Sequence, residues 1–477
     1  DIDTIYISCE EGACKRDGSL FLKVLNAEKI DRTKIVHIGD SLRNDCIGAL
    51  KDGIRTIKIQ RNIQMYNTKR FDSFLDEKIK FGVHHSIINN NILAIKSYYE
   101  RFGYSVLGPA LFSFCQWIID KCNELELRKV YFFSRDGYIL KKAFDSIKPD
   151  YIESRYIYVS RRSLRVPYNA CHSSIEEIIS FFPGTKRIDV KTLVSYLGIN
   201  VEDVNNILDK FELKPSDIIF YNDITTKYKG LLEQLLPMYK AKAKEELEEV
   251  IGYLKQEKVE GKMAVVDIGW HNSMQFCLEK ILKDENISHD ITGLYFGIQS
   301  TGSKEGKAYG FIRELDNNQS VDSIGAFIGL IESFFLEQTG TTLKYEKSNK
   351  IYCPIKEEYE YEKNSREYSA YAEIHKGALR YVHFIRQLIN QNEIGLKGKD
   401  AYLPIYTFGV KPYLYDVDKF GEFRYFSEGT YYLVGYKGMR HYLTDLVSFK
   451  NDLYNAKWKV GFLKKVLKLN FPYYKIY

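Results

Sequence analysis

The sequence predicts an α/β protein with two parallel-sheet units, the second carrying a helical insertion, and a mixed C-terminal region. Three observations predict this class. Short hydrophobic runs alternate with amphipathic stretches in residues 1–80 and again in 95–300, which is typical of parallel sheets. A mostly helical stretch at about 170–258 interrupts the second pattern. Residues 301–477 lack the alternation, and the chain is too long for one ordinary domain.

Composition favours a cytoplasmic protein that does not bind nucleic acid. The net charge of +6 is small for 477 residues and lacks the basic excess of a nucleic-acid binder. The eight cysteines form no Cys-x-x-Cys pair, as expected for reduced thiols. Residues 102–119 carry no charge, but their glycines and Gln116 favour a buried helix beginning near Pro109 over a membrane span.

Strands and helices alternate in the first unit. We expect strands at 4–7, 34–38 and 55–59, and helices at 20–29 and 45–52. The hydrophobic strands are short enough to lie in the middle of a parallel sheet. We therefore expect a Rossmann-like arrangement, in which ligands bind at the carboxyl ends of the strands.

Polar residues follow the expected strands of the first unit. Asp40 comes directly after the strand at 34–38, and Asp45 lies five residues further along the same loop. Two carboxylates at this edge can bind Mg²⁺, which prefers few carboxylates together with water and phosphate oxygens. Ser8 follows the strand at 4–7, where its hydroxyl could hold a phosphate oxygen, and Lys15 could neutralise phosphate charge.

In this order, these residues resemble motifs two, three and four of the haloacid-dehalogenase-type (HAD) phosphohydrolases. The resemblance covers Ile5 to Ile59. It implies that Ser8 binds phosphate and that Lys15 is the catalytic lysine. It also implies that Asp40 and Asp45 are the metal ligands.

The nucleophile of that family is missing from the first unit. The family uses an aspartate in Asp-x-Asp directly after a strand. Asp1 and Asp3 have this spacing, but no strand precedes them. We therefore expect that the front of this domain lies outside the sequence or that the domain is a remnant, and that it does not turn over a phosphate ester alone.

A second set of polar residues follows three strands of the second unit. The strand at 129–133 leads into Ser134, Arg135 and Asp136, and the helix at 139–146 comes next. The strand at 156–159 and the strand at 263–266 also end in polar residues, and another strand is expected at 291–296. Ser160, Arg161 and Arg162 follow the strand at 156–159, and Asp267 follows the strand at 263–266.

This layout also resembles a HAD core, with Ser134 in the place of the nucleophilic aspartate. A serine there cannot form the family's aspartyl-phosphate. The resemblance leaves Asp136 and Asp267 as catalytic residues or cation ligands. Phosphate binding then falls to the serines and arginines of the set, namely Ser134, Arg135, Ser160, Arg161 and Arg162.

Simpler interpretations of the same residues remain open. Asp136 could cap the helix that follows it, and Arg161 and Arg162 could form surface ion pairs. Glu332 is a polar residue in an apolar run, and it either reaches the pocket or ends a buried helix. A pocket and a set of structural contacts are thus the two alternatives.

The whole chain resembles large bacterial proteins described as HAD-superfamily hydrolases, which are often associated with surface-polysaccharide biosynthesis and glycosyltransferases. The resemblance implies a Mg²⁺-dependent phosphohydrolase or phosphotransferase acting on a sugar-phosphate or glycan-phosphate. The first alternative is a sugar-nucleotide-binding or glycosyl-transferring module with a vestigial first unit. The second is a non-catalytic scaffold for glycosyltransferase partners.

The C-terminal region gives three further expectations. The run of charges and tyrosines at 357–364 is typical of a solvated face, and 368–389 is expected to be helical. Residues 456–477 contain lysines and aromatic residues but no acidic residue. We expect a terminal helix packed on the protein, and the alternative is peripheral contact with the inner face of a membrane.

Overall fold

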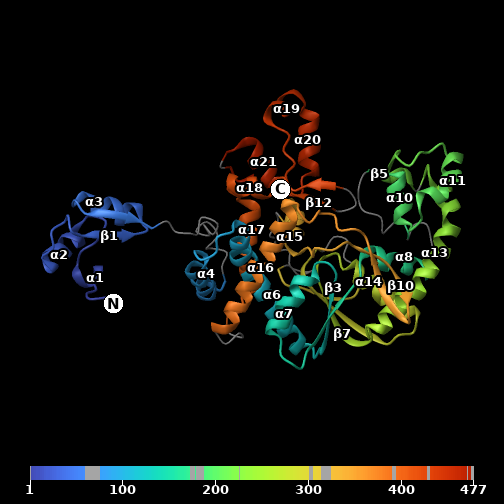
Figure 1. The fold of residues 1–477 in the computed structure, drawn as a ribbon, viewed down its shortest axis with the longest axis horizontal. Helices are drawn as coiled ribbons and strands as arrows, with labels where there is room; N and C mark the ends of the chain where they lie inside the picture. The colour runs from blue at the N-terminus through green and yellow to red at the C-terminus, as the bar shows by residue number, and fades with distance from the viewer. Residues whose placement is uncertain are drawn as a thin grey trace. The chain divides into compact units, whose positions relative to one another are not determined.

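The computed structural model describes most of the chain, and its residues form two compact units, Asp1–Asn67 and Thr68–Tyr477. Figure 1 shows the elements of both units in chain order. The described residues are 2–59, 76–171, 178, 187–224, 226–299, 305–312, 324–388, 394–426, 430–469 and 471–473.

The first unit is built around two parallel strands. β1 and β2 pair in register from Val36 with Arg55 to Gly39 with Lys58. Its buried cluster is small, with Phe21, Ala49 and Ile54 at the centre. The prediction of a strand at 4–7 is wrong, because these residues form no strand and a short helix begins directly after them. The elements are α1 (Ser8–Glu11), α2 (Ser19–Glu28), β1 (Val36–Gly39), η1 (Leu42–Ile47), α3 (Gly48–Lys51) and β2 (Arg55–Lys58).

One face of the β1–β2 sheet is open in residues 2–59. Val36, Ile38, Ile57 and Ile59 alternate along the two strands and are each about half exposed, at 47%, 56%, 54% and 53%. His37 points to the opposite face, where its ring meets Phe21 edge-on. A parallel sheet in a complete α/β domain is covered on both faces. Residues 2–59 thus show a two-stranded parallel sheet with one face uncovered, and not the full Rossmann-like arrangement that the sequence predicts.

The second unit contains the parallel sheet that the sequence predicts. Five strands pair in the order β4-β3-β7-β8-β9, and every pairing is parallel. The chain runs from β3 outward to β4 and then crosses to β7 on the other side of β3. The point between β3 and β7 is therefore the topological switch point, where ligands bind in such sheets. The strands are β3 (Lys129–Phe133), β4 (Glu153–Ile157), β7 (Gly261–Trp270), β8 (His289–Ile298) and β9 (Lys307–Gly310).

Helices cover both faces of this sheet. Tyr131 and Phe133 of β3 join the core beneath α8, α13 and α14, whereas the Phe132 ring packs against Phe144 of α7. Because successive side chains of a strand point to opposite faces of the sheet, β3 contributes to the core on both faces. The helices of these layers, together with those that pack on them, are α4 (Lys78–Ile92), α5 (Tyr98–Phe102), η4 (Gly103–Leu107), α6 (Gly108–Glu124), α7 (Gly137–Ile147), α8 (Arg161–Cys171), α13 (Lys229–Gln256), α14 (Ser273–Asp284) and α16 (Arg366–Leu388).

The uncharged segment lies in the interior, as the sequence predicts. It belongs to the continuous helix Tyr98–Glu124, which is long and apolar enough to cross a membrane. Of its most apolar window, 94% is buried inside the protein. The prediction that this helix begins near Pro109 is wrong, because the helix begins at Tyr98. Pro109 lies at the start of α6, directly after the π-helical segment η4.

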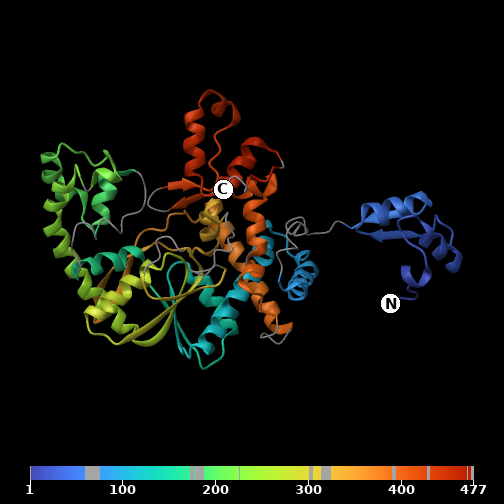
Figure 2. The same ribbon diagram turned by 180° about the vertical axis from the view of Figure 1, so that it is seen from behind.

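The insertion between β4 and β7 has its own small core. Figures 1 and 2 show it to one side of the sheet, carried by α8 and α13. Val190, Leu193 and Leu231 are among the residues of this core. The inserted elements are β5 (Arg187–Asp189), α10 (Val190–Tyr196), η5 (Val201–Val204), α11 (Asn205–Lys210), β6 (Ile218–Phe220) and α12 (Tyr221–Ile224), and β5 pairs with β6 antiparallel.

The C-terminal elements wrap around the same sheet-containing body. The hairpin β10–β11 lies against α13, and α16 packs on α5, η4 and α6. Trp458 is fully buried and its indole donates to the Gly409 carbonyl, so the packing expected for the start of the tail is confirmed. The elements are η6 (Ile324–Ala326), α15 (Ile328–Phe335), β10 (Thr342–Ser348), β11 (Ile351–Lys356), α17 (Gly398–Val410), α18 (Leu414–Phe420), β12 (Arg424–Phe426), β13 (Thr430–Tyr432), α19 (Met439–Thr444), α20 (Leu446–Asn455) and α21 (Lys459–Leu467).

A buried histidine in this body predicts a loss of stability in acid. His84 is 2% exposed, and burial lowers its pKa to about 4. Its ring nitrogens contact the Tyr381 hydroxyl at 2.6 Å and the Ile394 carbonyl at 2.7 Å, which the neutral ring satisfies. The unfolded chain takes up a proton near pH 6.5, so the stabilisation is present above that pH and lost as pH falls through about 4.

We expect this histidine to contribute on the order of 3 kcal/mol to the pH dependence of unfolding. Urea unfolding at about pH 7 and about pH 4.5 measures it. His84→Gln should flatten the dependence, whereas His441→Gln, at an exposed position, should leave it unchanged. Equal slopes for His84→Gln and the parent protein would contradict the assignment.

Candidate functional site

A cavity of about 590 Å³ opens at the carboxyl edge of the five-stranded sheet. It lies where β3, β4 and β7 end, which is the switch point of the strand order. This volume is in the range of sites that hold small molecules and cofactors. The first residues of α7, α8 and α14 follow these strands, so three helix N-termini lie near the cavity and favour an anion there.

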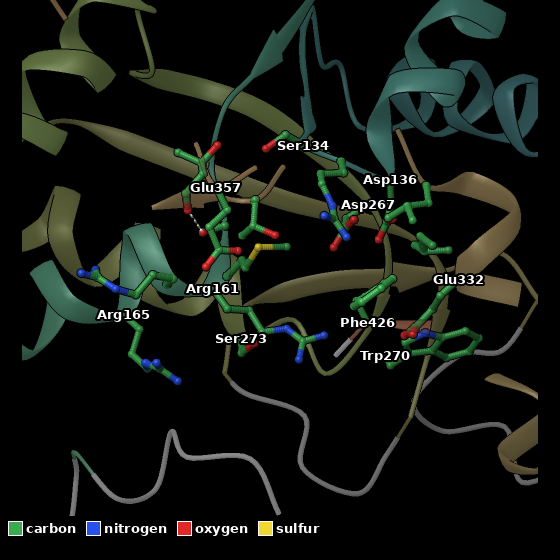
Figure 3. Close-up of a pocket in the computed structure, with 18 of the residues that line it drawn as sticks. Ser134, Asp136, Arg161, Arg165, Asp267, Trp270, Ser273, Glu332, Glu357 and Phe426 are labelled. Carbon is green, nitrogen blue, oxygen red and sulfur yellow. Dashed lines mark hydrogen bonds between the residues drawn. The ribbon is translucent and has the colours of Figure 1, made fainter. Parts of the chain in front are cut away.

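All the residues that the sequence singles out in the second unit line this one cavity. Figure 3 shows several of them. Glu332 also lines it, which decides between its two interpretations. The predicted lining residues are Ser134, Arg135, Asp136, Ser160, Arg161, Arg162 and Asp267.

Asp136 and Asp267 form an interacting pair of acids. Burial raises the pKa of Asp136 well above its usual value, and the charges of Asp267 and Glu332 raise it further. Burial also raises the pKa of Asp267 to about 7, although backbone N–H groups of Ile268 and Gly269 and the Arg161 charge oppose the change. Two acids in one low-dielectric site cannot both ionise easily, so the pair holds a proton near neutral pH.

The described residues leave part of the hydrogen-bonding capacity of this pair unused. Asp136 occupies the N-cap position of α7 but makes no side-chain cap hydrogen bond, so the capping interpretation is wrong. Asp267 is 6% exposed, and its Oδ1 atom is buried without a hydrogen-bond partner in the described part of the chain. A buried oxygen of this kind carries a desolvation cost unless a ligand satisfies it.

The four arginines of the cavity have different surroundings. Arg162 forms a two-point pair with Glu246, at 2.7 Å and 2.9 Å. Arg135 pairs with Glu360. The charge of Arg161 acts on both acids of the pair, and Arg165 is buried in the cavity wall four residues further along α8. Arg161 is therefore close enough to the acid pair to act on its charge, and Arg165 extends the positive charge of α8 along the cavity wall.

The two serines that the sequence predicts to bind phosphate direct their hydroxyl hydrogens into the protein. The Ser134 hydroxyl donates to the Val159 carbonyl at 2.8 Å. The Ser160 hydroxyl donates to the Thr342 carbonyl at 2.6 Å and accepts from the Ser163 N–H at 3.0 Å. A phosphate oxygen needs donors, so in this arrangement neither hydroxyl supplies one. Their role here is to hold β4, α8 and β10 in place.

An aromatic wall forms another side of the cavity. Trp270 is 4% exposed, has a backbone φ of +85°, and its indole Nε1 is buried without a partner among the described residues. A positive φ is costly for a bulky side chain and persists where the surroundings hold it. Phe426 and Tyr425 continue the wall, and the Tyr425 hydroxyl donates to Glu332. Figure 3 shows Trp270 and Phe426 near Glu332, with Arg165 at the other end of the view.

Sequence reasoning missed part of this cavity. Arg165 could have been found, because it lies one helical turn after Arg161 on the same face. Tyr425 and Phe426 gave no local signal, since β12 is far from the sheet in the sequence. The prediction of a solvated face at 357–364 is wrong in part, because Glu357 and Glu360 line the cavity and Tyr361 is 2% exposed.

The structure brings together some of the residues expected at the first site. Lys15 Nζ lies 2.6 Å from Asp45 Oδ1, and the same oxygen meets the His37 ring at 3.1 Å. The Ser41 N–H donates to Asp45 Oδ2 at 2.9 Å. These contacts, led by Lys15, hold the pKa of Asp45 well below its usual range. The sequence did not predict His37, which lies in the strand expected at 34–38, as a member of this site.

The other two residues expected at the first site, Ser8 and Asp40, are more exposed than Asp45. Ser8 does not end a strand; it is the exposed first residue of α1. Asp40 directly follows β1 and is partly exposed. Because both carboxylate oxygens of Asp45 already have partners, the described residues of this unit do not fit a divalent cation well. Lys15 instead neutralises the charge, and the His37 ring contacts the same carboxylate.

Comparison of the sequence with models of protein families and with curated proteins finds no match. The residues of the cavity therefore provide the evidence for its chemistry.

The second-unit cavity fits a cation better than the first site. Among the described residues there is no group of three or more His, Cys, Asp or Glu side chains that could hold a metal ion. Mg²⁺ does not need such a group, because it often binds through one or two carboxylates, water and the phosphate of a substrate. The buried Oδ1 of Asp267 and the neighbouring Asp136 provide that minimum.

Proposed function

We propose that the second unit carries out Mg²⁺-dependent phosphoryl chemistry on a sugar phosphate bound at the carboxyl edge of its sheet. The observation that carries the proposal is the buried Oδ1 of Asp267, which has no partner among the described residues and lies in the cavity that Asp136 also lines. A divalent cation held by Asp136 and Asp267 would offset the cost of burying two acids. It would also supply the charge that stabilises a transferring phosphoryl group.

The arginines and helix N-termini would hold the phosphate. Arg161 lies close enough to both acids to act on their charges, and α14 begins with Ser273 at the cavity wall. A planar guanidinium can donate two parallel hydrogen bonds to phosphate oxygens. The phosphate would thus lie between Arg161 and the acids, with its ester group toward the remaining walls.

The aromatic wall supports an ester group that contains a ring with hydroxyls. The unpartnered indole N–H of Trp270 can donate to one hydroxyl, and the Glu332 carboxylate can accept from another. Phe426 and the Trp270 ring can pack against the apolar face of a sugar. A substrate from surface-polysaccharide assembly, with a glycosyltransferase acting before or after this protein, would meet these requirements.

The acceptor of the phosphoryl group would be a bound molecule. Ser134 stands in the place of an aspartate nucleophile, and its hydroxyl hydrogen is directed to Val159. Water or the hydroxyl of a second substrate would therefore attack phosphorus as the bond to the sugar oxygen breaks. One acid of the pair Asp136 and Asp267 would accept the proton of the attacking group, and the other would give its proton to the leaving sugar oxygen. An acid pair that holds one proton near neutral pH can perform this exchange.

A second candidate is a site that binds a sugar nucleotide and transfers the sugar. The size of the cavity favours it, because about 590 Å³ leaves room beyond a single sugar phosphate. The buried Arg165 at one end could meet a second phosphate. The two functions differ in the ligand that stabilises the protein.

Thermal unfolding of the full chain with different ligands tests the proposal. We expect Mg²⁺ together with a hexose phosphate to raise the melting temperature, and each alone to raise it less. A ligand at roughly one hundred times its Kd adds about 2.7 kcal/mol of stability. Asp267→Asn should remove the Mg²⁺ effect, and Asp45→Asn should keep it. Stabilisation by sugar nucleotides without Mg²⁺ would favour the second candidate, and no response to any ligand would contradict both.

A further inference from the structure

The helical hairpin α19–α20 places an apolar, basic tip on the surface of the second unit. Figures 1 and 2 both show the two helices standing out from the body. Leu443, Leu446 and Val447 are three aliphatic residues within five positions, and they are 74%, 69% and 68% exposed. Tyr454 on the same hairpin is 65% exposed. Exposed apolar residues gathered this closely on a surface usually mark a contact with another phase or molecule.

The hairpin is held firmly, so the exposure is not a result of a loose end. The Tyr442 ring packs against Phe449 and Phe462, which ties both helices to α21. The Tyr442 hydroxyl contacts Asp452 at 3.0 Å, and Lys437 Nζ donates to the same carboxylate group at 2.9 Å. The apolar residues therefore point outward from a fixed platform.

The charges around the tip are positive toward solvent. Arg440 and Lys450 are exposed and form no ion pair within the described residues. Asp452 is paired with Lys437, whereas Asp445 accepts from the Ser448 N–H at 2.9 Å at the start of α20 and keeps its negative charge. Arg440 and Lys450 together outweigh Asp445, so the charge next to the aliphatic residues is positive on balance.

This combination fits a lipid surface better than a protein groove. A stable protein interface buries about 800 Å² per partner on a broad and complementary surface. Here a narrow tip carries only a few aliphatic side chains, flanked by lysine and arginine. Such side chains insert between lipid headgroups, and basic residues beside them are attracted to anionic lipids.

We propose that the tip of the α19–α20 hairpin inserts its aliphatic residues into the surface of an anionic membrane. This assigns peripheral contact to residues 439–450 and not to the start of the tail, where Val460, Phe462 and Leu463 are buried. The inference is independent of the chemistry at the cavity, because it involves none of the residues that line it.

Vesicle sedimentation of the full chain tests the inference. We expect binding to vesicles of phosphatidylcholine mixed with phosphatidylglycerol, and at least about tenfold weaker binding to phosphatidylcholine alone. High salt should weaken the binding through screening. Leu443→Ser, Leu446→Ser and Val447→Ser together should abolish it, and Arg440→Glu with Lys450→Glu should remove the preference for anionic lipid.

A matched control uses exposed apolar residues elsewhere on the second unit. Ile79→Ser, Leu93→Ser and Ile351→Ser change side chains that are 86%, 68% and 56% exposed, and this variant should bind vesicles like the parent protein. Circular dichroism melts show whether each variant folds. Val447→Trp should also shift its fluorescence to shorter wavelength when anionic vesicles are added. Equal binding by the hairpin and control variants, or no binding to either vesicle, would overturn the inference; self-association through the tip in the latter case would identify a protein contact.

Discussion

Asp267→Asn should lower Mg²⁺-dependent turnover of a sugar phosphate by about 10²–10⁴-fold, the range associated with loss of a catalytic acid or base. The amide keeps the shape of the carboxyl group but removes the negative charge that would hold the cation. Activity should fall in kcat more than in KM, since the phosphate would still meet Arg161 and the helix N-termini.

The stability of this variant separates a functional role from a structural one. Asp267 Oδ1 has no partner in the described residues, so the substitution breaks no hydrogen bond at that atom. It also removes a buried group whose charged form is costly, as the raised pKa indicates. We therefore expect an unchanged or higher melting temperature in the absence of ligand. A variant that loses both activity and stability would point to a structural carboxylate instead.

The acids of the first unit provide the control. Asp45 is already paired with Lys15 and contacts the His37 ring, so Asp45→Asn should leave turnover at the second-unit cavity unchanged. Asp40→Asn should do the same. Equal loss in Asp40→Asn and Asp267→Asn would place the chemistry in the first unit and contradict the proposal.

Local patterns in the sequence were sufficient to predict the sheet of the second unit. The strand at 129–133 matches β3 residue for residue, because a buried run bounded by polar turn residues leaves little choice. β7 extends further than the expected 263–266 and reaches Trp270. Since the carboxyl ends of parallel strands meet at one edge, the order of strands alone brings Asp136 and Asp267 together.

The features that the sequence did not predict depend on contacts between residues that are far apart in the sequence. Nothing near Tyr425 indicates that β12 would close a cavity formed by β3 and β7, and Glu360 lies in a run that reads as solvated. The prediction of a strand at 4–7 was wrong for a different reason. A short β-rich run becomes a strand only where a neighbour supplies hydrogen bonds, and residues 2–59 offer none to Ile5 and its neighbours.

Arg162 was expected to bind phosphate, but its surroundings predict a large effect on stability. Its guanidinium forms two hydrogen bonds with Glu246 of α13, which is 2% exposed. The pair joins α8 to α13, the two helices that carry the insertion. Glu246→Ala would leave the arginine without its partner in a poorly hydrated position, and we expect a loss of about 3–5 kcal/mol.

Replacing both partners tests whether the unpaired charge is the cause. Arg162→Met with Glu246→Leu removes both charges and fills similar volume, so it should recover most of the stability lost in Glu246→Ala. Urea unfolding followed by circular dichroism measures the free energies, and limited proteolysis reports whether the insertion opens first. If Arg162 instead served mainly to bind phosphate, Glu246→Ala would cost little stability and would change ligand affinity. The double replacement would then offer no recovery, because there would be no buried unpaired charge to remove.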